Sequence, residues 1–294
     1  MAYSDLNTYL KRRFGAKVYK AAVSLATTCP NRDGRKGYGG CAFCSNAGSG
    51  DFIPEQTLSV TEQIDGAIER LRDKVPADTL YIAYFQSFTN TYVSPEVLEK
   101  ALTEAFSHPK VVMVSLGTRP DCLPDDILDV LERMNRIKPV MVELGLQTMH
   151  DKTAESFNRC YKTEEFEEAV RKLKKIGCET VAHLIFGLPG ETREMMLQST
   201  AYAVGTGIDG IKFTCLYVLK GSRLGEEYEK GTVEVLGKEE YFDIVEEALK
   251  LVPSDVIVHR LTGDGPKKLL LAPMWTANKR DVINYINRRF RPGN

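Results

Sequence analysis

At 294 residues, with 43% hydrophobic and 27% charged residues, the chain has an ordinary globular composition and enough length for one barrel-sized domain. Its formal net charge of −1 excludes a generally basic nucleic-acid-binding protein, so a polyanion would have to be met by local basic patches. The sequence has neither an apolar signal segment nor an apolar run long enough to cross a membrane, and its seven cysteines form no regular framework. We therefore expect a cytoplasmic protein with no membrane span, whose thiols stay free or bind metal.

Strand-like runs alternate with helical patterns along most of the chain. The apolar runs predict strands at Val18–Leu25, Thr79–Phe85, Val111–Leu116, Val140–Leu146, Thr180–Phe186 and Ile211–Val218. Between and after them, amphipathic patterns predict helices at Val60–Lys74, Pro95–Phe106, Pro124–Arg136, Glu164–Ile176, Thr192–Val204 and Glu239–Leu251. Thr61 is the expected cap of the first of these helices, and Gly177 is the expected end of the fourth.

Six successive β–α units with nearly continuous apolar strands predict a parallel sheet covered by helices. An open doubly wound sheet and a barrel both fit this pattern. We favour the barrel because no long crossover reverses the strand order. The expected fold is thus α/β, a partial (βα)6 TIM-like barrel over residues 1–252. A C-terminal extension, 253–294, would pack on the barrel with an extra strand and a basic helix at Lys279–Arg291.

The segment Thr27–Phe52 contains three cysteines in a glycine-rich setting. Eleven residues separate Cys29 from Cys41, and two separate Cys41 from Cys44. Glycines and Pro30 disfavour a helix or strand here and allow a loop that brings three thiolates to one metal centre. Thiolates hold iron–sulfur clusters, and three of them leave one iron of a cube open. Two alternatives are a zinc ribbon completed by a distant cysteine and a reduced loop without metal.

Polar or glycine-containing segments follow each predicted strand. The cysteine loop follows the first strand, and the later ones are followed by FQSFTNTY, GTRPD, QTMHD, GLPGET and LKGSR. Chemistry in parallel α/β folds gathers at the carboxyl ends of the strands. We therefore expect these segments to surround one site.

The ordered set of motifs resembles the radical S-adenosylmethionine superfamily. It consists of the cysteine loop with Phe43 before its last cysteine, VELGLQTMHD, HLIFGLPGET and HRLTGDGPKKLLLAPMW. Within that superfamily the chain is similar to the branch containing the elongator catalytic subunit, MiaB-type enzymes and coproporphyrinogen dehydrogenases. The eleven-residue spacing narrows the resemblance to the YtqA/YhcC (MnmL-type) group.

The resemblance implies two cofactors and the residues that hold them. Cys29, Cys41 and Cys44 would bind three irons of a [4Fe–4S] cluster, and S-adenosylmethionine would chelate the fourth iron. Arg159 would reach the carboxylate of that cofactor and Gln147 its ribose, while Gln86 stands where many relatives have a Gly-Gly-Glu turn. The complete implied set of cofactor-binding residues is Phe43, Gln86, Ser87, Glu143, Gln147, Arg159, His183, Ile185 and Gly187.

Several of these residues also have purely structural interpretations. Glu143 could be a polar residue inside the barrel whose carboxylate is satisfied by a neighbour. Arg159 could cap the following helix, and His183 could be a core histidine. The remaining cysteines, Cys122, Cys160, Cys178 and Cys215, are expected to be buried small apolar residues, with Cys160 close to the site.

The implied activity is formation of a 5′-deoxyadenosyl radical that abstracts hydrogen from a substrate. The similar group is linked to the tRNA wobble uridine, where it converts 5-carboxymethylaminomethyl(-2-thio)uridine to the 5-aminomethyl form. A reductant such as flavodoxin or ferredoxin would supply the electron. Basic clusters that could contact tRNA are Lys11, Arg12, Arg13, Lys267, Lys268, Lys279, Arg280, Arg288, Arg289 and Arg291. Alternatives are a radical enzyme acting on a small molecule or protein, and a non-enzymatic zinc-binding adaptor.

Overall fold

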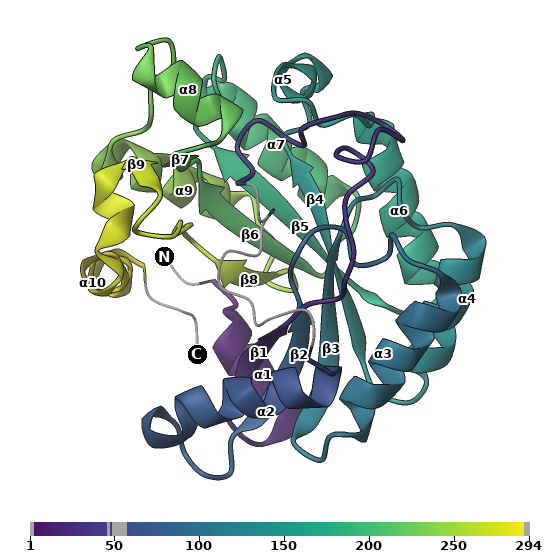
Figure 1. The fold of residues 1–294 in the computed structure, drawn as a ribbon. Helices are drawn as coiled ribbons and strands as arrows, with labels where there is room; N and C mark the ends of the chain where they lie inside the picture. The colour runs from purple at the N-terminus through teal and green to yellow at the C-terminus, as the bar shows by residue number, and fades with distance from the viewer. Residues whose placement is uncertain (1–2, 46–47, 49–57, 291–294) are drawn as a thin grey trace.

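In the computed structural model, seven parallel strands form a curled sheet with helices on its outer side (Figure 1). The structure describes residues 3–45, 48 and 58–290. The spatial order is β1-β2-β3-β4-β5-β6-β8, and each neighbouring pair is parallel. The strands are β1 (Val18–Val23), β2 (Leu80–Phe85), β3 (Val111–Thr118), β4 (Val140–Gln147), β5 (Glu179–Phe186), β6 (Gly210–Cys215) and β8 (Ile257–Arg260). This confirms the α/β partial-barrel prediction.

The predicted helices are all present, with small changes at their ends. They are α2 (Val60–Leu71), α3 (Pro95–Ser107), α4 (Asp125–Asn135), α6 (Thr163–Lys175), α7 (Arg193–Gly205) and α9 (Lys238–Lys250). The cap of α2 is Ser59 rather than Thr61. Its hydroxyl accepts from the backbone N–H of Glu62, and the Glu62 carboxylate accepts from the backbone N–H of Ser59, which is a complete capping box.

Several elements were not predicted. A helix at the N-terminus, α1 (Leu6–Phe14), and two short helices, α5 (Asp151–Ser156) and α8 (Arg223–Glu229), lie outside the β–α pattern. The predicted strand Ile211–Val218 divides after Cys215, because the chain leaves the sheet and Val218 begins an antiparallel pair of β7 (Val218–Leu219) with β9 (Leu270–Ala272). Short 3₁₀ turns occur at Arg72–Lys74 and Met274–Ala277.

The C-terminal segment contributes to the barrel sheet itself. Strand β8, predicted only as part of an extension, pairs with β6 and is the seventh strand. The basic helix is α10 (Lys279–Arg289), while Arg291 lies outside the described residues, as do residues 46–47 and 49–52 of the cysteine segment. No helix in the described part of the chain combines the length and apolar character needed to cross a bilayer.

The interior of the barrel is layered along its axis. At the amino ends of the strands, inward-facing apolar side chains form a plug that α1 covers with Leu10; the plug consists of Val18, Ile82, Met113, Met141 and Val181. Two residues further along the strands, on the same inward face, stand Lys20, Ser115, Glu143 and His183. The apolar plug thus closes one end, and polar groups line the path to the other end.

We predict that Leu10→Ala destabilises the protein by about 2–5 kcal/mol, since it removes a buried side chain from the plug and leaves a cavity. Urea unfolding would measure the change. Lys11→Ala, at an exposed position of the same helix, is the matched control and should change the free energy of unfolding little. Equal effects of the two substitutions would contradict the role of the plug.

Candidate active site

A cavity of about 260 Å³ at the carboxyl ends of the strands contains the cysteines of the loop. Cys29, Cys41 and Cys44 all line it. Seven of the predicted cofactor residues line the same cavity, namely Phe43, Gln86, Glu143, Gln147, Arg159, His183 and Ile185. The fold therefore brings the cysteine loop, which follows β1, to residues of β4 and β5 that lie about a hundred or more positions later.

Two predicted residues do not line the cavity. Ser87 is buried, and its hydroxyl lies 2.6 Å from the hydroxyl of Ser24. Gly187 has a φ of +88°, and a Cβ there would lie 3.0 Å from the side chain of Leu236. Glycine at this position is thus explained by a left-handed backbone conformation and close packing.

Nitrogen donors surround the cysteine sulfurs. The Arg119 Nη1 lies 4.0 Å from the Sγ of Cys29, and the Asn31 Nδ2 lies 3.7 Å from the Sγ of Cys41. The hydrogen bond between the two thiols lowers the pKa of Cys44 and raises that of Cys41, and the positive charge of Arg32 lowers the pKa of Cys44 further. Such donors stabilise thiolates and any anionic group bound to them. Arg119 and Asn31 were not predicted as site residues, although Arg119 belongs to the GTRPD segment.

The loop is held by the connection between β4 and α6. The side-chain amide of Asn158 donates to the carbonyl oxygens of Tyr38 at 3.1 Å and Gly40 at 2.9 Å. The Ala42 N–H donates to the Phe157 carbonyl at 2.9 Å, and the rings of Phe43 and Phe157 have their centroids 5.2 Å apart. The position of two of the cysteines is therefore set by residues 157 and 158.

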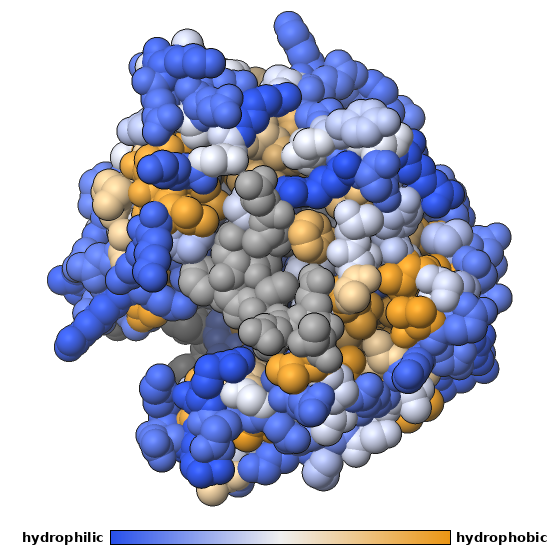
Figure 2. Space-filling view, viewed as in Figure 1, coloured by the Kyte–Doolittle hydropathy of each residue, from blue (hydrophilic) through white to orange (hydrophobic). Residues whose placement is uncertain are grey.

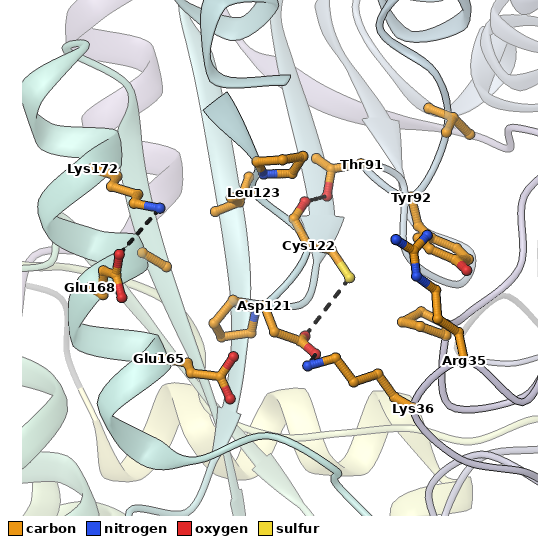
Figure 3. A pocket seen from close by; sticks show the side chains of 15 residues that line it. Arg35, Lys36, Thr91, Tyr92, Asp121, Cys122, Leu123, Glu165, Glu168 and Lys172 are labelled. Carbon is orange, nitrogen blue, oxygen red and sulfur yellow. Dashed lines mark hydrogen bonds and ion pairs between the residues drawn. The ribbon is translucent and has the colours of Figure 1, made fainter. Parts of the chain in front are cut away.

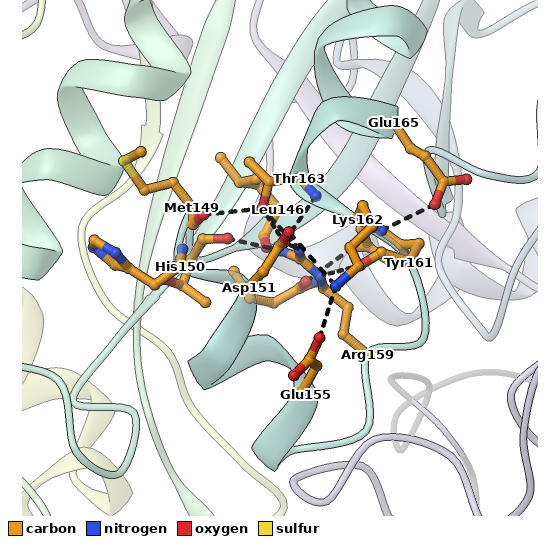
Figure 4. Close-up of polar contacts among 12 residues, drawn as sticks. Leu146, Met149, His150, Asp151, Glu155, Arg159, Tyr161, Lys162, Thr163 and Glu165 are labelled. Atoms are coloured by element: carbon orange, nitrogen blue, oxygen red, sulfur yellow. Dashed lines mark hydrogen bonds and ion pairs between the residues drawn. The ribbon is translucent and has the colours of Figure 1, made fainter.

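Arg159 organises that connection from inside (Figure 4). Its side chain is 1% exposed. All five guanidinium N–H groups are donated within the protein, over distances of 2.7–3.1 Å, to the carbonyl oxygens of Leu146, Thr148 and Tyr161, the Asp151 carboxylate and the Thr163 hydroxyl. A cofactor carboxylate could be bound by Arg159 only if it displaced one of these acceptors. The structure thus gives this arginine a positioning role beside the cavity.

Glu143 is the centre of a charged layer in the barrel. Its carboxylate is fully buried and accepts from Lys20 Nζ at 2.5 Å, Ser115 Oγ at 2.8 Å and His183 Nε2 at 2.9 Å, and it also contacts Lys212 Nζ. The neighbours that would satisfy a buried carboxylate are therefore present, and Glu143 still lines the cavity. The two lysines were not predicted as site residues.

Within the charged layer, the pKa values of His183 and Lys212 are both lowered. Burial, together with the nearby Lys212 ammonium, lowers the pKa of His183 to about 4, even though Glu143 opposes this shift. The neutral ring must carry its proton on Nε2 to donate to Glu143, which leaves Nδ1 as an acceptor. Burial also lowers the pKa of Lys212 to about 7.

The other cysteines are placed largely as expected. Cys122, Cys178 and Cys215 are buried, and Cys160 is partly exposed with its Sγ 3.1 Å from the Asn158 side-chain oxygen.

A second cavity, of about 610 Å³, lies on the other side of the cysteine loop (Figure 3). Its walls come from the loop itself, from the segments after β2 and β3, and from α6. Labelled side chains around it include Lys36 and Asp121, whose charged atoms are 3.6 Å apart, and the Glu168–Lys172 pair on α6. None of the predicted site residues lines this cavity.

Comparison with known proteins decides the family. Residues 23–203 match the Radical SAM superfamily, and residues 208–291 match the Radical_SAM C-terminal domain. The chain is 43% identical over 286 residues to the protein YtqA of Bacillus subtilis, which covers 97% of this chain and 88% of that protein. The protein belongs to the radical SAM superfamily.

Two further similarities are more distant. The radical SAM chain is 26% identical over 196 residues to the tRNA uridine(34) acetyltransferase of Methanocaldococcus jannaschii, which covers 65% of this chain and 36% of that protein. Its fold matches the solved structure of Methanocaldococcus infernus Elp3 with a TM-score of 0.68 and 18% identity, covering 93% of this chain and 63% of that one. The resemblance to the Elp3-like branch and to the YtqA/YhcC group is thereby confirmed.

Family membership also confirms the predicted cofactors, a [4Fe–4S] cluster and S-adenosylmethionine, and makes the chain an enzyme. The donor set fits the cluster, because three cysteine sulfurs line one cavity and N–H groups lie beside two of them. Within residues 3–45, 48 and 58–290, no three His, Cys, Asp or Glu side chains gather around a point that could hold a single metal ion. A cube assigns each thiolate to a different iron, so its ligands need not converge in that way.

We predict that Cys41→Ala greatly reduces iron binding and abolishes reductive cleavage of S-adenosylmethionine. Anaerobic reconstitution, iron analysis and assay of 5′-deoxyadenosine would measure this, with about four irons expected for the unchanged protein. Cys178→Ala, in the core behind the sheet, is the control and should keep both properties. If Cys41→Ala kept normal iron content and cleavage, the ligand assignment would be wrong.

His183 is expected to make the stability of the protein depend on pH in the acid range. The unfolded protein protonates a histidine near pH 6.5, whereas folded His183 resists protonation until about pH 4. The resulting stabilisation is complete above pH 6.5 and decreases as the pH falls to 4, by about 3 kcal/mol. His183→Gln retains an N–H for Glu143 and should flatten the loss of stability in this window. Because burial also lowers the pKa of His259, part of the slope should remain. Thermal unfolding at a series of pH values would test this, and an unchanged slope would contradict it.

Proposed function

We propose that this radical SAM enzyme acts in the cytoplasm on the side chain of the tRNA wobble uridine. In the proposed reaction, S-adenosylmethionine acts as the two-electron oxidant of the carboxymethylamino group of 5-carboxymethylaminomethyl(-2-thio)uridine. Hydrogen abstraction from the carbon next to the carboxylate and loss of one further electron give an imine, and water then releases the two carbons as glyoxylate and leaves the 5-aminomethyl form. The observation that carries most weight is the similarity, over 65% of the chain, to a protein named for its action on tRNA uridine 34. The high identity to YtqA supports assignment to the group for which this reaction was inferred.

The arrangement of the cavity suits radical chemistry on a base held inside the barrel. When bound, the cluster and S-adenosylmethionine supply a radical that abstracts hydrogen, using an electron from a donor such as flavodoxin or ferredoxin. The protein must hold the target carbon near that radical and limit access of water. The apolar plug closes the far end of the barrel, so a substrate would enter at the cysteine-containing end, and a base in tRNA would have to be splayed out to do so.

The predicted basic clusters are only partly available to phosphates. Arg13 pairs with Glu179, Lys279 with Asp264, and Arg289 with both Asp243 and Glu246. The exposed positions outside these pairs that could contact phosphates are Lys267, Lys268, Arg280 and Arg288. Lys11 and Arg12 are also exposed, but they lie on α1, which covers the plugged end of the barrel. The rim of the face in Figure 2 is mainly hydrophilic.

We predict that a strain lacking this gene accumulates 5-carboxymethylaminomethyl(-2-thio)uridine and loses the 5-aminomethyl form. Mass spectrometry of nucleosides from digested tRNA would measure both. The unchanged gene should restore the normal profile, whereas the Cys41→Ala gene should not. A nucleoside profile that does not change on deletion would exclude the wobble uridine and favour a small-molecule or protein substrate.

A further inference from the structure

The charged layer beneath the cysteines contains more positive than negative charge. Lys20 and Lys212 both contact the carboxylate of Glu143, and among residues 3–45, 48 and 58–290 this is the only carboxylate that pairs with either lysine. The ring of Tyr84 lies between the lysines, with its centroid 4.1 Å from the ammonium of Lys20 and 5.0 Å from that of Lys212. Two ammonium groups therefore share one negative charge.

The other titratable groups of this layer do not cancel the excess. His183 is neutral at pH 7 because burial lowers its pKa to about 4, and Tyr84 is neutral because burial raises its pKa. Burial lowers the pKa of His259 as well, so that ring is also uncharged. Arg260 also lines the cavity, but it is paired with Asp264. The layer thus carries one net positive charge when both lysines are protonated. Because burial lowers the pKa of Lys212 to about 7, this lysine is about half protonated at pH 7, and an anion bound beside it would raise its pKa and complete the charge.

This excess charge faces the space where a substrate would lie. Lys212, Tyr84, Glu143 and His183 line the same cavity as the three cysteines. On the mouth side of Glu143, β3 and β4 carry Gly117 and Gly145. The Gln147 side chain occupies the space beside Gly145, whereas the nearest atoms to the missing side chain of Gly117 are backbone atoms. A buried cation without its own counter-ion is costly, and an anion from a ligand would relieve that cost. The lowered pKa of Lys212 is consistent with such an unrelieved charge, since Lys20 adds to the effect of burial.

We propose that Lys212, at the inner end of the cavity, forms a subsite for a carboxylate group of the substrate. Lys20 does not line the cavity, but it contacts the other oxygen of Glu143 and so leaves the charge of Lys212 partly uncompensated. A single carboxylate matches the single excess charge. A phosphate would bring nearly two negative charges next to Glu143 and leave the layer with a net negative charge. The inference deepens the proposed function, on which it rests for the nature of the substrate, because the carboxymethyl group would then be the part of the nucleoside that reaches Lys212.

Binding to the reconstituted holoenzyme tests the subsite directly. The probes are the nucleoside 5-carboxymethylaminomethyluridine and its methyl ester, which keeps the amine but lacks the carboxylate charge, compared by anaerobic equilibrium dialysis in the presence of S-adenosylmethionine. We expect the acid to bind at least about tenfold more tightly than the ester, which is the magnitude of one charge-assisted hydrogen bond. Lys212→Met should remove most of this preference. Lys220→Met, at an exposed position after β7, is the matched control and should retain it.

A second variant and a second pair of probes distinguish loss of the subsite from misfolding and from a different substrate. Lys20→Met should also reduce the preference, and iron content together with thermal unfolding would identify any variant that fails to fold. N-benzylglycine and its amide also differ by the carboxylate charge while both keep the amine, and they contain no nucleoside. If the protein binds N-benzylglycine more tightly than its amide but binds neither nucleoside, the subsite is upheld and the wobble-uridine function is contradicted. Nucleosides that bind equally well as acid and ester would overturn the subsite alone, and the absence of binding by either acid would overturn it as well.

Discussion

The site depends on one enclosed guanidinium. Arg159 fixes the connection between β4 and α6 through donors to three carbonyl oxygens and two side chains. Residues 157 and 158 of that connection then hold the loop that carries Cys41 and Cys44. A buried arginine is stable only when every N–H has an acceptor, so Arg159 can be buried only when this connection is folded. The cysteines can therefore take their positions only when the connection has folded around Arg159. The loop, although rich in glycine, is therefore attached to the barrel at defined points.

Backbone strain is concentrated in the same region. In the described part of the chain, the non-glycine residues with positive φ are Phe88, Gln147, Asn158 and Cys160. Phe88 and Gln147 line the cavity, and Asn158 and Cys160 flank Arg159. Each such conformation costs about 1–3 kcal/mol and persists only where surrounding contacts require it. The hydrogen bonds of Arg159 and Asn158 are contacts that can hold such conformations. The strained residues and these hydrogen bonds thus lie at the same end of the barrel, where the chemistry would take place.

The comparison of sequence with structure shows which signals were strong. Continuous apolar strands and amphipathic helices were enough to predict the sheet, and the cysteine spacing singled out a loop whose three cysteines line one cavity. The charged layer was missed because strands with apolar residues on both faces hide which face points inward. Lys20 in VYKAAV and Lys212 in IKFTC are lysines within otherwise apolar strands, and each needs a buried partner. That signal, combined with Glu143 in a neighbouring strand, could have identified the layer. The five contacts of Arg159 could not, since they depend on carbonyl positions set by the tertiary fold.

Within the residues that the structure describes, the barrel has seven strands and does not close, so β8 has one side with no neighbouring strand in the sheet. Exposed strand edges can recruit strands from other molecules and begin aggregation. Here the segment preceding α1 lies along that side: the N–H of Val258 donates to the carbonyl of Ser4 at 2.7 Å, and Asp5 forms a parallel bridge with Val258. Ser4 and Asp5 thus cover the open edge of β8 at Val258. An incomplete barrel can in this way keep its lateral opening without offering a template for fibril-like assembly.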